Sequence, residues 1–180
     1  MKKQSKQLMI LLVILVFVIV GYFGLQKYYQ VQNEKQNEET RTILIDVARD
    51  DITAFTFDYE GQTYSLEKKE DIWYYTEDNS IEINQNRILA MLNGVSPLYA
   101  EQEIANVTDM AQYGLDNPSK TITIQTETGS YTVEAGAYNS FHSVYYLRFP
   151  GENTVYTVKA QSITTFDRDM EDLKVEESTE

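Results

Sequence analysis

The chain is 180 residues long, contains no cysteine, and carries 28 acidic against 15 basic side chains, which gives a net charge of −13. The lack of cysteine excludes disulfides, catalysis by a thiolate and thiolate metal sites. The acidic balance argues against nucleic acid and anionic lipid surfaces as binding partners, because both would repel the chain.

An uncharged apolar run occupies residues 8–25 and follows a short segment that contains Lys2, Lys3 and Lys6. As an α-helix this run would reach about 27 Å, close to the roughly 30 Å of hydrocarbon in a bilayer. The basic flank predicts that residues 1–7 form a cytoplasmic tail and that the rest of the chain is extracytoplasmic. We therefore expect a single-pass protein of the cytoplasmic membrane, held in lipid by residues 8–25.

A cleaved secretory signal is the competing interpretation, since it also begins with lysines and continues with apolar residues. The run is longer than the roughly 7 to 15 residues of a usual signal core. It also ends in the sequence GYFGL at residues 21–25, which is not an A-x-A-like cleavage site. These two features favour an uncleaved anchor.

Residues 26–42 are poor in aliphatic side chains and rich in Gln, Asn and Glu, and we interpret them as a stalk, either helical or coiled. A single extracytoplasmic domain is expected over residues 43–175, followed by an acidic tail at residues 176–180. All 28 acidic and 12 of the 15 basic side chains lie beyond residue 25, so this part has a net charge of −16.

The first half of the predicted domain begins with alternating segments that are typical of β-strands. Residues 52–57 predict a strand with Ile52 on one face and Phe55 and Phe57 on the other. Gly61 marks the turn of a hairpin. The next strands are expected over residues 63–68 and 72–76.

A helix should follow, with Asn84 as its N-cap, because apolar residues recur after it at steps of three and four. It should end before Pro97. Its apolar residues are Ile88, Leu89, Met91, Leu92 and Val95.

The second half of the domain repeats this order. Strands are expected over residues 120–125, 131–134, 144–149 and 155–158, and a helix over residues 160–166. We therefore predict an α+β fold in which an N-terminal transmembrane helix precedes a mostly antiparallel, β-rich domain of two related strand-strand-strand-helix units.

Between the two halves, residues 109–118 form the most specific local motif. Asp109 and Gln112 fit a helix-capping pair, and Gly114 can adopt the left-handed conformation that closes a short helix. Leu115 can then fold back as an apolar contact, while Pro118 prevents the helix from continuing. We interpret this segment as a structural helix stop.

These features resemble a bacterial family catalogued as domain of unknown function number four-three-four-zero. The resemblance extends over residues 5–170 and includes the lysine-rich start, the membrane helix and the paired strands that end at Val155 and Tyr156. Its two sequence motifs consist of Trp73, Tyr74 and Tyr75, and of Tyr113, Gly114, Leu115, Asp116 and Pro118. The resemblance implies membrane-anchored extracytoplasmic proteins of unassigned chemistry, often encoded beside ABC-type export systems with auxiliary gliding-type subunits. The family defines no catalytic residues, so none is carried over.

The sequence offers little support for catalysis, a metal site or a cofactor. His142 is the only histidine, which excludes a multi-histidine metal centre. Ser143 is its neighbour, and in a strand the two side chains would point to opposite faces. We therefore expect a histidine in a loop or at a sheet edge, and a hydrolase would require a deep pocket that joins it to a hydroxyl and a carboxylate.

Adjacent tyrosines offer a candidate interaction surface, because in each pair one ring must face outward if the other faces inward. These residues are Tyr74, Tyr75, Tyr145 and Tyr146. Our main prediction is a non-catalytic accessory protein that binds a protein partner in a membrane complex, with no metal, no cofactor and no nucleic acid. The alternative is a module that uses the exposed tyrosines to bind cell-wall glycan.

Overall fold

The computed structural model describes residues 19, 21–22, 24–27 and 41–176, and the chain divides into two compact units, Met1–Arg41 and Thr42–Glu180. In the first unit, the described residues between 19 and 27 are α-helical. Within the described part of the chain, no helix combines the length and the apolar character that a membrane span requires.

Several predicted segments lie wholly or mostly outside the described residues. They are the cytoplasmic tail over residues 1–7, the membrane span over residues 8–25, the stalk over residues 26–42 and the acidic tail over residues 176–180. These assignments stay predictions.

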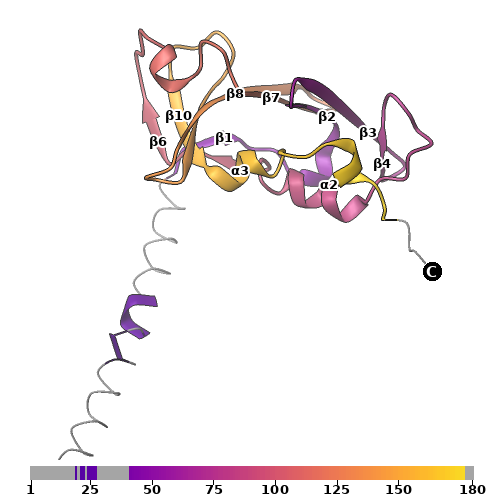
Figure 1. The fold of residues 1–180 in the computed structure, drawn as a ribbon, viewed down its shortest axis with the longest axis horizontal. Helices are drawn as coiled ribbons and strands as arrows, with labels where there is room; N and C mark the ends of the chain where they lie inside the picture. Colours follow the sequence, from indigo (N-terminus) through magenta and orange to yellow (C-terminus); the bar gives the residue numbers. More distant parts are fainter. Residues whose placement is uncertain (1–18, 20, 23, 28–40, 177–180) are drawn as a thin grey trace, which may run out of the picture. The chain divides into compact units, whose positions relative to one another are not determined.

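The second unit is built on an eight-stranded sheet in which every neighbouring pair of strands is antiparallel (Figure 1). The strands follow the order β4-β3-β2-β7-β8-β9-β10-β6 across this sheet, and β1 pairs with β5 in a separate two-stranded sheet. The strands are β1 (Ile43–Ile45), β2 (Ile52–Tyr59), β3 (Gln62–Lys69), β4 (Ile72–Tyr75), β5 (Leu98–Tyr99), β6 (Gln102–Ile104), β7 (Lys120–Thr126), β8 (Ser130–Asn139), β9 (Val144–Arg148) and β10 (Val155–Lys159).

The hairpin between β2 and β3 shows how a local signal sets the sheet register. Glu60 and Gly61 both have positive φ, at 50° and 79°, as a tight two-residue hairpin turn requires. Phe57 consequently pairs with Tyr64, and Phe55 with Leu66. The predicted hairpin around Gly61 is therefore confirmed.

The expected orientation of Ile52 is wrong. The pairing of β2 with β7 shifts register between Ile52 and Ala54, which marks a β-bulge. Because a bulge adds one residue to a strand, it reverses the alternation of side chains at that point. Ile52 is thus fully buried, as are Phe55 and Phe57, which had been expected on the opposite face.

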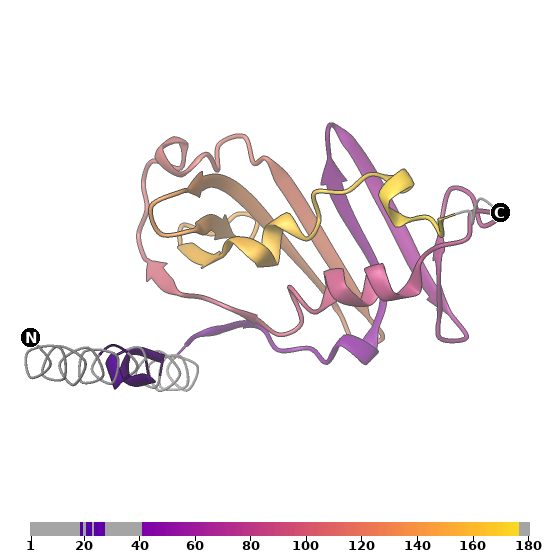
Figure 2. The same ribbon diagram turned by 60° about the horizontal axis from the view of Figure 1, so that its bottom comes forward.

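The helices lie on one face of the sheet (Figure 2). The helix α2 (Gln85–Leu92) begins where expected, since the Asn84 side chain accepts a hydrogen bond from the backbone N–H of Arg87. The helix α3 (Ala160–Thr164) ends two residues earlier than the predicted helix, and α4 (Met170–Leu173) follows it. The fold is therefore α+β and mostly antiparallel, as predicted.

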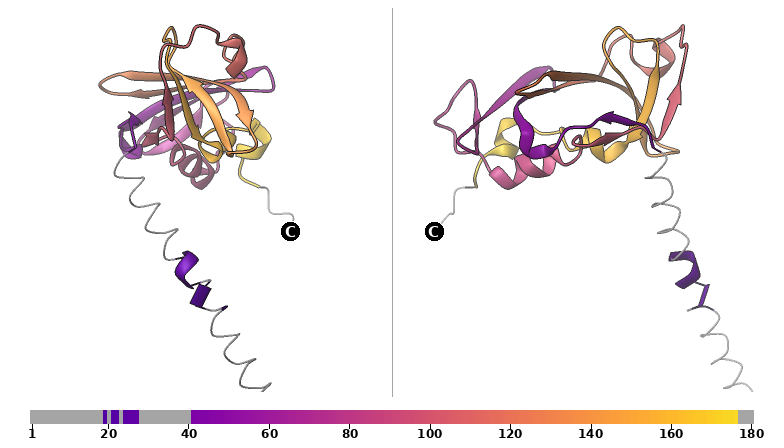
Figure 3. Two further views of the ribbon diagram at one scale, coloured as in Figure 1. Left: turned by 90° about the vertical axis from the view of Figure 1, so that its left-hand side faces the viewer. Right: turned by 180° about the vertical axis from the view of Figure 1, so that it is seen from behind.

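The main core lies between the sheet and these helices, and β1 runs along the same side (Figure 3). Aromatic rings occupy its centre, with Phe55 in edge contact with Trp73 at 5.2 Å and with Phe166 at 6.3 Å between ring centroids. We call this set of buried side chains the main cluster. It joins β2 and β4 to the segment after α3.

A second cluster of buried side chains consists of Val107, Leu115 and Val155. Val155 precedes Tyr156, which pairs with Leu147 of the main cluster, so Val155 faces the other side of the sheet. Figure 1 accordingly shows the salmon-coloured coil near residue 112 across the sheet from α2 and α3. The sheet is therefore covered extensively on one face and only at one end on the other.

Candidate functional site

The motif at residues 109–118 forms a compact loop that we call the motif loop. It contains a single 3₁₀ turn, Ala111–Tyr113, which ends at Gly114 with φ at 68°, in the left-handed conformation that was predicted. The Leu115 N–H donates to the carbonyl of Met110 over 3.0 Å and closes the turn. The predicted helix stop is thus confirmed, although the helix that it ends is one turn long.

The capping pair in this loop differs from the expected capping box. The Asp109 carboxylate accepts a hydrogen bond from the Ala111 N–H over 3.1 Å, and the Gln112 side-chain amide donates to the Asp109 carbonyl over 3.0 Å. In a capping box the second side chain would instead accept from a backbone N–H. The pair therefore stabilises a turn of the loop rather than the start of a longer helix.

The motif loop packs directly on β8. Leu115 is fully buried in the second cluster, whereas Asp116 is exposed and Pro118 is half-buried. A Cβ atom added to Gly136 would lie 2.3 Å from the Tyr113 carbonyl oxygen, so only glycine allows the two backbones to approach this closely. This contact fixes the position of the Tyr113 backbone.

Tyr113 holds the ring of Tyr146 on β9. The two ring centroids are 4.9 Å apart, with an interplanar angle of 65°, which is an edge-to-face contact. The Asn139 side-chain amide donates to the Tyr146 hydroxyl over 3.1 Å. Tyr146 is thereby held by the motif loop and by the end of β8.

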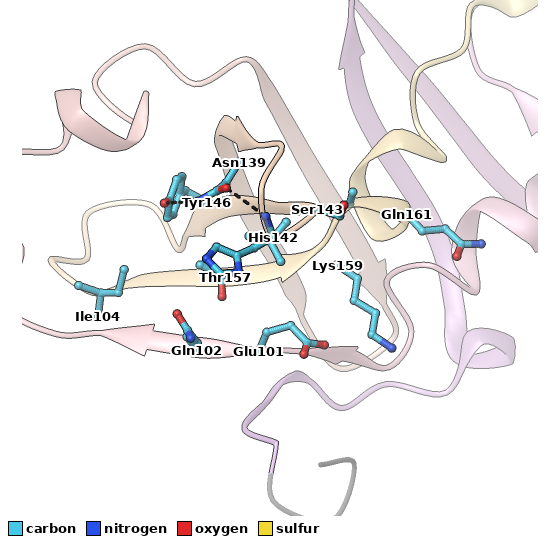
Figure 4. A pocket seen from close by; sticks show the side chains of 12 residues that line it. Glu101, Gln102, Ile104, Asn139, His142, Ser143, Tyr146, Thr157, Lys159 and Gln161 are labelled. Atoms are coloured by element: carbon cyan, nitrogen blue, oxygen red, sulfur yellow. Dashed lines mark hydrogen bonds between the residues drawn. The ribbon is translucent and has the colours of Figure 1, made fainter. Parts of the chain in front are cut away.

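Tyr146 lines a hollow of about 700 Å³, a volume within the range of about 300–1,000 Å³ that is common for small-ligand sites. Its floor is a row of three side chains on neighbouring strands, because Thr157 on β10 pairs with Gln102 on β6 and with Tyr146 on β9. Figure 4 shows these side chains around the hollow, together with His142 from the turn between β8 and β9. Charged groups of opposite sign, Glu101 and Lys159, also line it.

The turn between β8 and β9 forms one wall of the hollow. The Asn139 carboxamide oxygen accepts hydrogen bonds from the backbone N–H groups of Phe141 and His142, over 3.1 and 3.2 Å. Phe141 is 88% exposed, and its ring meets the His142 ring edge-on at 4.8 Å. The turn therefore presents an apolar ring to solvent on an ordered backbone.

The family model for "Domain of unknown function (DUF4340)" matches residues 73–177, more than half of the chain. The chain belongs to this family. Comparison with curated proteins and with solved structures gave no match. The matched residues of this DUF4340 protein include the motif loop and the hollow, so both lie within the shared domain.

His142 and Ser143 do not form the arrangement that a hydrolase needs. Both lie in the turn rather than in a strand, so the expected alternation of their side chains does not apply. His142 is exposed, and across residues 41–176 its imidazole makes no hydrogen bond to a hydroxyl or a carboxylate. The interpretation of His142 as a loop histidine is confirmed.

Metal-binding groups are not clustered in the described part of this DUF4340 domain. No three or more of its histidine, aspartate and glutamate side chains lie close enough together to hold a metal ion. A further hollow of about 600 Å³, near η1 (Arg49–Asp51), is lined by several acidic side chains. In that hollow the Lys68 ammonium donates to the Asp50 carbonyl over 2.6 Å.

The four predicted surface tyrosines do not form one surface. Tyr75 pairs with Leu66 and packs against the main cluster, while its neighbour Tyr74 pairs with Glu67 on the other face of the sheet. Tyr145 likewise packs against the main cluster, and Tyr146 lines the hollow. The two pairs are far apart, because four strands, β3, β2, β7 and β8, separate β4 from β9.

The environment of Tyr75 perturbs its ionisation. Burial, together with a hydrogen bond of 2.8 Å from its hydroxyl to the Glu77 carboxylate, raises the pKa of Tyr75 to about 12. Burial also raises the pKa of Tyr145, with a smaller contribution from the negative charge of Asp167. Both phenols are therefore neutral donors at physiological pH.

The other structural motif residue, Trp73, connects the first edge of the sheet to α2. Its ring is buried, at 3% exposure. Its backbone N–H donates to the Gln85 side-chain oxygen over 2.8 Å, and its carbonyl accepts from the same amide over 3.1 Å. The Gln85 side chain thus pairs with the open edge of β4 as a neighbouring strand would.

Sequence reasoning missed Gln102, Thr157 and Phe141. Strand β6 is three residues long and has no alternating pattern that would identify it. Thr157 lies in a strand that was predicted, but its place beside Gln102 depends on a pairing between distant segments. Phe141 follows Asn139 and Ser140, and a turn signal of this kind could have identified an exposed tip.

Proposed function

We propose that this DUF4340 protein is a non-catalytic, membrane-anchored extracytoplasmic accessory protein that docks onto other components of a membrane assembly. The apolar run at residues 8–25 supports the anchor, and its basic flank supports an extracytoplasmic domain. The family resemblance supports an ABC-type export system as that assembly. The observation that carries the docking function is the exposure of Phe141.

Phe141 has the properties of a residue that anchors a protein interface. It is 88% exposed, and Tyr138 on the same hairpin is 49% exposed. The ring of Tyr138 lies 5.1 Å from that of Tyr145, and the hydrogen bonds from Asn139 order the turn. Because the tip is already ordered, binding would cost little conformational entropy, and aromatic anchors of this kind dominate the energy of many interfaces.

The charge of the domain indicates which surface charge a partner should have. The part of the chain beyond residue 25 has a net charge of −16. A partner with a basic surface around an apolar pocket would gain from long-range attraction, whereas an acidic partner would be repelled. We therefore propose a permease, or its auxiliary subunit, with a basic extracytoplasmic face.

We further propose that the domain consists of two related units. Strands β2, β3 and β4 are followed by α2, and strands β7, β8, β9 and β10 are followed by α3. The first strands of the two sets, β2 and β7, are antiparallel neighbours at the middle of the sheet, and each set continues outward in sequence order. This arrangement supports a two-fold relation between the units, with β10 added to the second.

The test is affinity purification of the tagged full-length chain from gently solubilised membranes, with mass spectrometry of what is recovered. We expect an ABC permease or its auxiliary subunit to be recovered with the unaltered chain. Phe141→Ser should abolish this recovery, since the side chain contributes to the interface and little to the fold.

The matched control is Ile72→Ser. Ile72 is 46% exposed and lies on β4, the edge strand that three further strands separate from β8. This variant should recover the same partner in the same amount. Recovery of the chain alone, or equal losses with both variants, would contradict the proposal.

A further inference from the structure

The floor of the hollow contains the hydroxyl group of a buried residue, and within the described part of the chain this hydroxyl makes no hydrogen bond. Thr157 is 5% exposed and lines the hollow. Across residues 41–176, no side chain or backbone group forms a hydrogen bond with its hydroxyl, although its backbone carbonyl accepts from the Glu101 N–H over 2.7 Å. A hydroxyl has one donor and two acceptor sites. The hydroxyl is thus available to a ligand that enters the hollow.

The groups on either side of Thr157 can bind the rest of such a ligand. Gln102 lies beside it on β6 and can both donate and accept hydrogen bonds. Tyr146 lies beside it on β9, and its ring is held by Tyr113 and Asn139. A ring that is already fixed can cover an apolar ligand face without further loss of entropy.

The charges around the hollow disfavour an anionic ligand, and the opposite signs of two lining side chains give no net preference for a cation. Glu101 and Lys159 line it and have opposite charges. The strongly acidic domain as a whole repels anions. A ligand that combines many hydroxyl groups with an apolar face and no net charge is a neutral sugar.

From these observations we propose that the hollow between β6, β10 and the turn after β8 binds a neutral saccharide. One sugar hydroxyl pairs with the Thr157 hydroxyl, a second pairs with the Gln102 amide, and the C–H face of the sugar ring packs on Tyr146. Phe141 is not among the residues that line the hollow, so a change of Phe141 removes none of these saccharide contacts.

The binding experiment uses the full-length chain in lipid nanodiscs, without glycoside detergents that would compete for the hollow. Saturation-transfer NMR titrations would measure maltotriose, which carries only hydroxyl groups, and chitotriose, which also carries acetamido groups. A galacturonic acid trimer serves as the anionic counterpart. We expect binding of at least one neutral trisaccharide and none of the anionic trimer.

Thr157→Val keeps the shape of the side chain and removes its hydroxyl, so affinity for the bound trisaccharide should fall about tenfold. Thr123→Val is the matched control, because Thr123 pairs its hydroxyl with that of Thr132 over 3.0 Å, outside the hollow. This control should bind as the unaltered chain does.

Gln102→Ala is a second variant, on an exposed edge strand, that does not alter a buried position. It should weaken saccharide binding about fivefold.

Three results would overturn the proposal. The first is that neither neutral trisaccharide binds at about 10 mM. The second is that the anionic trimer binds more strongly than the neutral trisaccharides. The third is that Thr157→Val and Gln102→Ala both leave the affinity unchanged. Partner recovery by the Phe141→Ser variant reports on docking alone. Failure of one proposal is therefore distinguishable from failure of the other.

Discussion

The two buried clusters of this domain lie on opposite faces of one sheet and differ in size and composition. The main cluster brings together side chains from the strands and from α2, α3 and α4, with four aromatic rings, Phe55, Phe57, Trp73 and Phe166, near its centre. The second cluster contains only Val107, Leu115 and Val155 as buried members. One face therefore holds most of the apolar burial, which is the dominant stabilising contribution in folding.

The smaller cluster has a positional role. It holds the motif loop on the sheet, and through Tyr113 that loop fixes Tyr146 beside the hollow. The turn that presents Phe141 begins at Asn139, which also bonds to Tyr146. We infer that stability depends mainly on the first face, and binding on the end of the sheet where the second cluster lies.

The largest effect should come from the main cluster. Phe55→Ala removes a fully buried ring that contacts both Trp73 and Phe166, and should lower the free energy of unfolding by about 3–5 kcal/mol. Urea denaturation followed by Trp73 fluorescence would measure it. Thr56→Ala, on the half-buried opposite face, should cost less than about 1 kcal/mol. Equal losses would show that the two faces contribute alike.

The next effect concerns a charge on the core side of the sheet. The Lys120 ammonium is buried, donates to the carbonyls of Asp58 and Phe166, and pairs with Asp167 over 3.0 Å. Lys120→Ala should lower the free energy of unfolding by about 2–3 kcal/mol, because both carbonyls lose a charged donor. Lys174→Ala, at an exposed pair with Glu171, should change it by less than about 0.5 kcal/mol. A neutral result for Lys120→Ala would mean that solvent replaces the ammonium.

Leu115→Ala in the second cluster should cost less stability than the two changes above. It should weaken saccharide binding in the hollow more than they do. The cost in unfolding free energy should be about 2 kcal/mol, at the low end for a buried leucine, because few side chains surround it. The Tyr113 ring should become mobile, which amide and aromatic NMR signals of Tyr146 would report. If those signals stay unchanged while stability falls, the motif loop has no positioning role.

The smallest effect is the pH dependence due to Tyr75. Burial and the Glu77 carboxylate raise the pKa of Tyr75 from 10.0 to about 12, so the folded state binds this proton more tightly than the unfolded state does. The resulting stability is fully present below pH 10 and is lost as the pH rises towards about 12. Tyr75→Phe should therefore flatten the stability curve between these values, as urea denaturation at several pH values would show. A curve that stays parallel to that of the unaltered chain would contradict this assignment.

Local sequence signals predicted most elements of the sheet. Gly61 identified the first hairpin because its positive φ is needed in a tight turn, and Asn84 identified the start of α2 because its side chain caps the helix. The motif at Gly114 predicted a chain reversal for the same steric reason. These features depend on residues close together in the sequence, which is why the pattern was sufficient.

Features that depend on distant segments could not be predicted in this way. The bulge that turns Ile52 inward arises in the pairing of β2 with β7, more than 70 residues later. Strand β8 continues to Asn139, past the expected end at residue 134, because pairing with β9 supports a stretch that contains Ala135 and Gly136. The hollow, likewise, requires β6 and β10 to be neighbours.

Site-specific photo-crosslinking in intact cells would show whether the Phe141 turn contacts a membrane partner. A photoreactive phenylalanine derivative would replace Phe141 at the tip of the turn between β8 and β9. In a second strain it would replace Ile72 on the edge strand β4. We expect a crosslinked species that contains an ABC permease or its auxiliary subunit from position 141 and none from position 72. The same species from both positions, or from position 72 alone, would contradict it.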